Sequence, residues 1–226
     1  MKTSIYICLV GFWAVLLSGC AYDNYEKPTT VLEGQVTYNG EPIYVSGSDV
    51  ELELWQPGYD FEEKVPVYLS QDGSFQAKLF DGTYKLTQLI GSGPWVPSTD
   101  TMTVEVNGLT TVEFPVEPYY LVRDAAITAN GGVIEATFRV EQINASEDIE
   151  AVALYLSDTQ FVDEINNLAN IEQPAASDDL NQSFTLSITP SGELTQGSYN
   201  VIYARIGVRT AGVADLIYSK VFEVEF

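Results

Sequence analysis

The sequence predicts an all-β protein of two antiparallel β-sandwich domains in tandem, with a short helix in the second domain. From residue 31 onwards, apolar and polar residues alternate with a period of two, the pattern of strands that bury one face. Turn-forming pairs such as Asn39-Gly40 and Asn107-Gly108 separate these runs at short intervals. No long helical pattern comes between the runs, which disfavours a parallel βαβ architecture.

The N-terminus has the three-part build of a secretory signal peptide. Lys2 supplies the positive charge, and Ile5–Leu17 forms an uncharged apolar core of 13 residues. A membrane-spanning helix needs about 20 such residues, so a permanent transmembrane anchor is the weaker interpretation. Leu-Ser-Gly-Cys at 17–20 resembles a bacterial lipobox, at which a peptidase cleaves before the cysteine. The sequence therefore predicts a signal peptide over 1–19 and lipidation of Cys20. An ordinary signal peptide with a cysteine at its cut site is the alternative.

Composition restricts the chemistry of the mature chain. Cys8 leaves with the signal peptide and lipid occupies Cys20, which leaves neither a free thiol nor a disulfide. The chain has no histidine, so the commonest general base, the serine and cysteine triads and ordinary zinc sites are excluded. With 32 acidic and 10 basic residues the net charge is −22, which repels nucleic acid. We expect no enzyme activity, no cofactor, no metal site and no nucleic-acid partner.

Residues 20–30 are polar and contain a proline, which predicts a lipidated tether, and residues 31–118 predict the first sandwich. Two of its runs show the clearest alternation. Their inward-facing residues are expected to be Val50, Leu52 and Leu54 in the first run, and Phe75, Ala77 and Leu79 in the second.

Two prolines in FPVEPYYLV mark the boundary of the second sandwich, residues 119–226. Tyr119 and Tyr120 are expected to fill the seam between the domains. Three runs repeat the alternation, and their inward-facing residues are expected to be Ile134, Ala136, Phe138 and Val140; Val152, Leu154 and Leu156; and Phe184, Leu186 and Ile188.

One segment of the second domain departs from strand periodicity. Phe161, Ile165 and Leu168 follow one another at helical spacing. The spacing predicts a short helix there, capped at its N-terminus by Ser157 or Asp158.

Two local patterns resemble known sandwich types. LEGQVTYNGEPI and DGSFQAKLFDGTYKL in the first domain resemble the transthyretin-like, carboxypeptidase-regulatory-like sandwiches. LTQGSYNVIYARIGV in the second resembles a strand corner of Ig-like and fibronectin-III-like sandwiches, in which Tyr199 would be the corner tyrosine that bonds upstream backbone. Both resemblances concern backbone turns and imply no activity.

A resemblance over nearly the whole mature chain is carried by YDNYEKPTTVLEGQV, LWQPGYDFEEKVPVYLSQDGSF, LIGSGPWVPSTDT and ALYLSDTQFV. These stretches resemble a two-domain lipoprotein family of Bacteroidota, a domain of unknown function found in polysaccharide-utilisation loci. The resemblance implies an outer-membrane location and an accessory role in glycan capture, beside a starch-utilisation-type transporter and its lid lipoprotein. It implies no catalytic residues. Asp23 and Glu26 resemble an export signal for the cell surface, although the periplasmic face stays open, and Thr101 lies in a short motif for O-glycosylation.

Three aromatic residues are candidates for stacking on sugar rings. Trp55 and Tyr59 flank a Pro-Gly turn, and Trp95 lies in the loop GSGPW. The polar partners of a bound glycan are expected to be Gln56, Asp60 and Asp100. Tryptophan in a small sandwich also packs in the interior, which is the favoured interpretation for Trp55. For Trp95 the two interpretations stay open.

Two acidic clusters, Asp60-Glu62-Glu63 and Ser177-Asp178-Asp179, lack the spacing of a calcium loop and are expected to be solvated surface. The functional prediction is a non-catalytic lipoprotein that assists glycan capture. The alternative is a structural or assembly subunit that docks on an outer-membrane complex without binding glycan itself.

Overall fold

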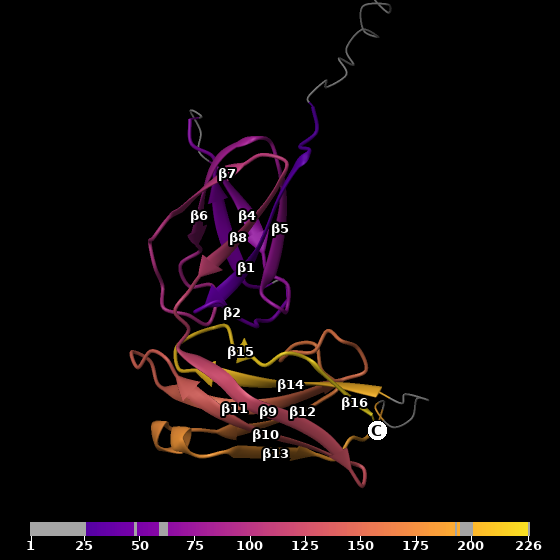
Figure 1. Ribbon diagram of the computed structural model, residues 1–226. Helices are drawn as coiled ribbons and strands as arrows, with labels where there is room; N and C mark the ends of the chain where they lie inside the picture. The colour runs from indigo at the N-terminus through magenta and orange to yellow at the C-terminus, as the bar shows by residue number, and fades with distance from the viewer. Residues whose placement is uncertain (1–25, 48, 59–62, 193, 195–200, 226) are drawn as a thin grey trace, which may run out of the picture.

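The computed structural model describes residues 26–47, 49–58, 63–192, 194 and 201–225 and shows an almost entirely β chain of two domains in tandem (Figure 1). The predicted fold class is confirmed. The signal peptide, Cys20, Asp23, Tyr59, Asp60 and Tyr199 lie outside the described residues. No helix among the described residues is long and apolar enough to cross a bilayer.

The N-terminal domain contains eight strands in two facing sheets. The strands are β1 (Thr30–Tyr38), β2 (Glu41–Pro42), β3 (Glu51–Trp55), β4 (Lys64–Tyr68), β5 (Ser74–Leu79), β6 (Gly82–Gln88), β7 (Met102–Val106) and β8 (Leu109–Pro115). One sheet has the order β2-β1-β5 with β8 paired in parallel to β1, and the other has the order β4-β3-β6-β7. The β1–β2 turn is Asn39-Gly40, where both residues have positive φ, as a two-residue hairpin turn requires.

The alternation predicted for this domain is confirmed. Leu52 and Leu54 on β3 are fully buried, and Val50 beside them is as well. On β5, Phe75 and Leu79 are buried and Ala77, between them, is partly buried against the same core. Because side chains alternate across a strand, these positions line the space between the two sheets.

The C-terminal domain contains the other eight strands and one 3-10 helix. The elements are β9 (Tyr120–Asn130), β10 (Val133–Gln142), β11 (Ile149–Ser157), β12 (Ala169–Pro174), η1 (Ser177–Asn181), β13 (Phe184–Ile188), β14 (Val201–Thr210), β15 (Ile217–Tyr218) and β16 (Phe222–Glu225). One sheet has the order β13-β10-β9 and the other β12-β11-β14-β15, with β16 also paired to β14. The inward faces predicted for β10 and β13 are confirmed.

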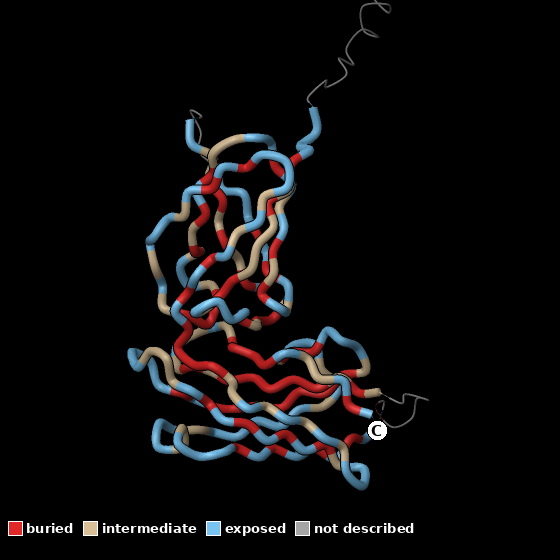
Figure 2. Tube along the Cα trace, viewed as in Figure 1, coloured by how far each residue is buried: buried red, intermediate tan, exposed pale blue. Residues whose placement is uncertain are grey.

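Strand β11 is buried on both faces, beyond the one-sided burial that alternation predicts. Its sheet lies between the three-stranded sheet and the N-terminal domain (Figure 1). Val152 and Leu154 point into the main core, whereas Ala153 and Tyr155 belong to a second cluster with Val162. The continuous apolar run AVALYL is typical of such a strand. Figure 2 shows this buried band directly below the junction.

The helix predicted from Phe161, Ile165 and Leu168 is wrong. Residues 158–168 form an irregular loop, and these three side chains are exposed by 62%, 70% and 42%. Ser157 Oγ accepts from the Thr159 amide at 3.3 Å, a local turn in place of a helix cap. The second domain does contain a short 3-10 helix, η1, but at Ser177–Asn181.

Candidate functional site

The two domains meet around a buried arginine. Arg205 on β14 has no exposed surface. Its five guanidinium N–H groups each donate a hydrogen bond, and the acceptors are Ser219 O, Gln71 O, Gln71 Oε1, Val162 O and Val45 O, at 2.8–3.3 Å. Val45 and Gln71 belong to the N-terminal domain, so one side chain ties both domains together.

The surroundings of Arg205 keep it charged at neutral pH. Burial lowers the pKa of its guanidinium to about 10, still well above neutrality. The guanidinium carbon lies 4.4 Å from the centre of the Tyr218 ring, a cation–π contact. Burial raises the pKa of the Tyr218 hydroxyl, so this tyrosine stays neutral beside the cation.

Further bonds cross the junction. The Tyr218 amide donates to Tyr44 O at 3.0 Å, and the Gly93 amide donates to the Asp215 carboxylate at 2.7 Å. Tyr119 is buried and donates its amide to Pro94 O across the junction, whereas the hydroxyl of the buried Tyr120 bonds Glu147 O and Gln142 within the C-terminal domain. The two domains therefore meet in a packed, hydrogen-bonded interface and are not joined only by a flexible linker.

Gln71, in the turn after β4, holds one loop of the C-terminal domain. Its Nε2 donates to Gln160 O at 3.0 Å, and its Oε1 accepts from the Val162 amide at 3.1 Å. These two bonds fix the backbone on both sides of Phe161. Val162 is fully buried beneath the loop, whereas the Phe161 ring is 62% exposed. The other domain thus holds an exposed aromatic residue in a set position.

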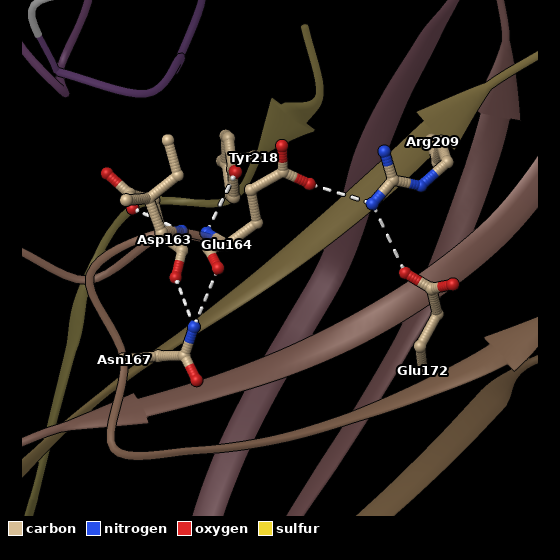
Figure 3. Close-up of polar contacts among 7 residues, drawn as sticks. Asp163, Glu164, Asn167, Glu172, Arg209 and Tyr218 are labelled. Carbon is tan, nitrogen blue, oxygen red and sulfur yellow. Dashed lines mark hydrogen bonds and ion pairs between the residues drawn. The ribbon is translucent and has the colours of Figure 1, made fainter. Parts of the chain in front are cut away.

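Asp163 fixes the rest of the same loop. The residue is 2% exposed, and its Oδ1 accepts from the amides of Ile165 and Asn166 at 2.9 and 2.7 Å. Asn166 Nδ2 donates to the same carboxylate. Asn167 Nδ2 donates back to Asp163 O (Figure 3). The carboxylate of Asp163 is therefore used within the loop.

Glu164 connects the loop to the sheet below it. Its amide donates to the Tyr218 hydroxyl at 3.3 Å, and its carboxylate pairs with Arg209 at 2.7 Å (Figure 3). Arg209 also contacts Glu172 on β12 at 3.3 Å. Hydrogen bonds thus fasten the loop to the N-terminal domain at one point and to β14 and β15 at others.

A groove of about 730 Å³ lies between this loop and the end of β4, within the size range of ligand sites. Tyr68, 53% exposed, lines it from the N-terminal domain, and Phe161, Ile165 and Leu168 line it from the loop. The lining also contains six neutral polar residues, Ser70, Gln71, Ser157, Thr159, Asn166 and Asn167, together with Gly47, Leu69 and the buried Asp163. Exposed rings with neutral hydrogen-bonding groups suit a ligand that has both apolar faces and hydroxyls.

The structure places Trp95 in the interior. Its side chain is 2% exposed, so its ring is not available for stacking on a sugar, and of the two interpretations left open the packing one is correct. A Cβ at Gly93 would lie 2.1 Å from the indole ring, so glycine is required for the ring to fold back onto the loop. The indole N–H has no hydrogen-bond partner in the described part of the chain.

The other described candidates do not form one site with Trp95. The Glu51 amide at the start of β3 bonds Ser92 Oγ near that loop, and Trp55 lies at the opposite end of the strand, roughly 13 Å away. Trp55 is partly buried on the outer face, where its Nε1 donates to Glu53, and Gln56 beside it is partly buried too.

Asp100 and Thr101 are exposed, and both line a separate hollow of about 510 Å³. Among the described residues no group of three potential metal-ligating side chains occurs. In the second acidic cluster, Asp179 accepts from the Ala176 amide and so caps η1.

Sequence reasoning missed Tyr68 and Phe161 as candidate residues. The turn-forming run Asp-Glu-Ile-Asn-Asn after Phe161 is the signal that could have identified an exposed loop there.

Comparison with known proteins identifies the family. Residues 30–117 match the model of the DUF3823 N-terminal domain and residues 120–223 that of the DUF3823_C domain, both described as of unknown function. A search of the curated proteins finds no match. A DUF3823 family structure from Parabacteroides merdae is 36% identical with a TM-score of 0.81, covering 88% of this chain and 100% of its own.

A DUF3823 family structure from Bacteroides ovatus is 35% identical with a TM-score of 0.79, covering 87% of this chain and 98% of its own. A third structure, of a candidate carbohydrate-binding protein from Bacteroides uniformis, is 20% identical with a TM-score of 0.73 and covers 88% and 100%. At that identity the likeness concerns the fold alone.

Proposed function

The chain belongs to the DUF3823 family, and from that premise we propose that it is a non-catalytic outer-membrane lipoprotein that captures glycan at the groove between its two domains. It is anchored through lipid on Cys20, faces the cell surface, and serves a starch-utilisation-type transporter with its lid lipoprotein. It uses no cofactor.

One observation carries the proposal: Phe161 is exposed, and Gln71 of the other domain fixes the backbone on both sides of it. Hydration of an exposed aromatic side chain is unfavourable, so covering it with a ligand is favourable. The fixed backbone of the loop reduces the entropy that is lost when the ligand binds. Tyr68 lines the same groove, so two rings are available to one ligand. A carbohydrate ligand would also agree with the description of the Bacteroides uniformis structure, which shares this fold, as a candidate carbohydrate-binding protein.

The position of the groove suits a membrane-anchored protein. Strand β1 begins at the end of the N-terminal domain remote from the junction and runs toward it (Figure 1). Nine residues of strand span roughly 25–30 Å, so the groove lies about that far from the start of β1. A tether attached there holds the groove clear of the bilayer.

The test is affinity electrophoresis of the mature protein in native gels that contain single polysaccharides. We expect at least one polysaccharide to retard the wild-type protein and the Phe161→Ala variant to lose that retardation. Loss of a ring buried by the ligand removes about 1.5–3 kcal/mol, a tenfold or greater loss of affinity. The matched control is Phe80→Ala, since Phe80 is 50% exposed and lies outside the groove. Absence of retardation by every polysaccharide would contradict the proposal.

The location is tested separately. Wild-type protein expressed in a Bacteroides host should fractionate with the outer membrane and be labelled by a fatty-acid probe. Cys20→Ala should abolish labelling and release the protein from the membrane, because the lipid supplies the membrane affinity. Membrane retention of the variant without label would contradict lipid anchoring.

A structural or assembly subunit is the second candidate, and the bonded junction favours it. Two domains fixed to each other can serve as a rigid spacer, and the exposed apolar side chains on the loop would meet a protein partner. Co-purification of a transporter after mild solubilisation, lost in Phe161→Ala, would favour this role. A solitary monomer would count against it.

A further inference from the structure

We infer that the groove selects uncharged glycans and rejects acidic ones such as sulfated or uronic-acid polysaccharides. The inference rests on the proposed function and names the ligand class of the same site. It follows from the charge of the lining, from how the polar groups are already bonded, and from the net charge of the chain.

The lining offers no countercharge to an anion. Among its described residues Asp163 is the one charged side chain, and neither lysine nor arginine is present. The carboxylate of Asp163 is buried and accepts bonds from Ile165 and Asn166, so it is not free to bind a cation either. An anionic ligand would lose hydration on entering the groove without gaining a countercharge there, which is unfavourable.

The nearest cations are already engaged or lie elsewhere. Arg205 lies behind Gln71 with all five N–H groups bonded, and Arg209 is paired with Glu164 and Glu172. Lys220 lines a neighbouring hollow, where the carboxylates of Asp72 and Glu223 also lie. Two acidic side chains therefore line the same hollow as Lys220 and the fully bonded Arg205.

The net charge of the whole chain also disfavours the binding of acidic glycans. A net charge of −22 repels polyanions at long range and lowers their rate of association. The groups that remain for recognition are neutral: the rings of Tyr68 and Phe161, the hydroxyl groups around them, and those amide hydrogen-bonding positions that the loop contacts leave unused. These groups match the apolar C–H faces and the hydroxyls of an uncharged sugar.

The experiment uses matched pairs of polysaccharides that share a backbone and differ in charge. Hydroxyethylcellulose is compared with carboxymethylcellulose, and dextran with dextran sulfate. Neutral mannan, xylan and galactan, and anionic polygalacturonate and chondroitin sulfate, extend the panel. Wild type, Phe161→Ala and Phe80→Ala are run in each gel, at about 0.05 M and about 0.5 M NaCl, because salt screens charge–charge attraction.

We expect retardation by one or more neutral polysaccharides, dependent on Phe161 and changed less than twofold by salt. The anionic polysaccharides should produce no retardation. Retardation by an anionic polysaccharide that depends on Phe161 would overturn the neutral selectivity, while the proposed glycan capture would stand. No retardation by any polysaccharide would overturn both.

Discussion

Replacing Arg205 with methionine should lower the free energy of unfolding by about 3–5 kcal/mol, because its hydrogen-bond acceptors stay behind in the interior without their donors. The substitution preserves much of the apolar volume but removes five donors. It leaves three backbone carbonyls at the junction without their donor, those of Val45, Val162 and Ser219, whereas Gln71 O still accepts from the Val45 amide. Each buried unpaired acceptor costs about 1–3 kcal/mol before relaxation.

Urea denaturation followed by intrinsic fluorescence measures this loss, and it also reports how the domains are coupled. The wild-type protein should unfold in one transition, whereas Arg205→Met should show two, because the domains lose their central tie. The matched control is Arg139→Met. Arg139 is 59% exposed and pairs with an exposed aspartate, so its loss should cost less than about 1 kcal/mol. Equal effects of the two variants would refute the role of Arg205.

Replacing Gly73 with alanine should cost about 2–5 kcal/mol. Gly73 has φ +77, and a Cβ there would lie 2.0 Å from the carbonyl oxygen of Ile43. The left-handed conformation costs about 1–2 kcal/mol for an L-residue, and forced overpacking adds about 1–3 kcal/mol. Gly73 follows Gln71 in the same turn, so a displaced turn should also loosen the clamp on the Phe161 loop.

The variant Gly40→Ala separates the cost of the left-handed backbone conformation from the cost of overpacking. Gly40 has φ +80, but nothing lies within 4 Å of the added Cβ, so only the conformational cost applies. Thermal unfolding should place Gly40→Ala about 1–2 kcal/mol below wild type and Gly73→Ala clearly lower. Equal losses would show that the turn tolerates the crowding at Ile43. Loss of glycan retardation in Gly73→Ala alone would connect this turn to the groove.

The strand pattern was predictable because it is local. Buried residues such as Phe138 and Leu186 alternate with exposed neighbours, and Leu52 alternates with half-buried ones. The pleat of each strand alone places these side chains on opposite faces. Burial of both faces of β11 depends on Val162, Tyr218 and the N-terminal domain packing on the outer face of its sheet, so alternation within the strand underestimates it.

The Phe161 segment shows why periodicity alone misplaced a candidate site. Three apolar residues at helical spacing occur there, but the side chain of Asp163 captures the amides of Ile165 and Asn166 and favours a loop. The clamp by Gln71 is about ninety residues distant in sequence, and no local pattern encodes it. The site was missed because it arises from tertiary contacts.

Trp95 is the reverse case. A loop rich in glycine and proline favours exposure, yet the absence of a side chain at Gly93 provides the space into which the indole folds. The tryptophans therefore did not indicate which aromatic residues line the groove. The exposed rings that line the groove are a tyrosine and a phenylalanine.

The central claim is that glycan binds in the groove between the domains, and NMR chemical-shift mapping tests it most directly. Isotope-labelled protein is titrated with short oligosaccharides cut from the neutral polysaccharide that retards it. The account predicts that the largest shift changes fall at residues 68–71 and 157–168, with Phe80 unaffected. Changes concentrated around Trp55 or Asp100, with residues 157–168 unchanged, would contradict it.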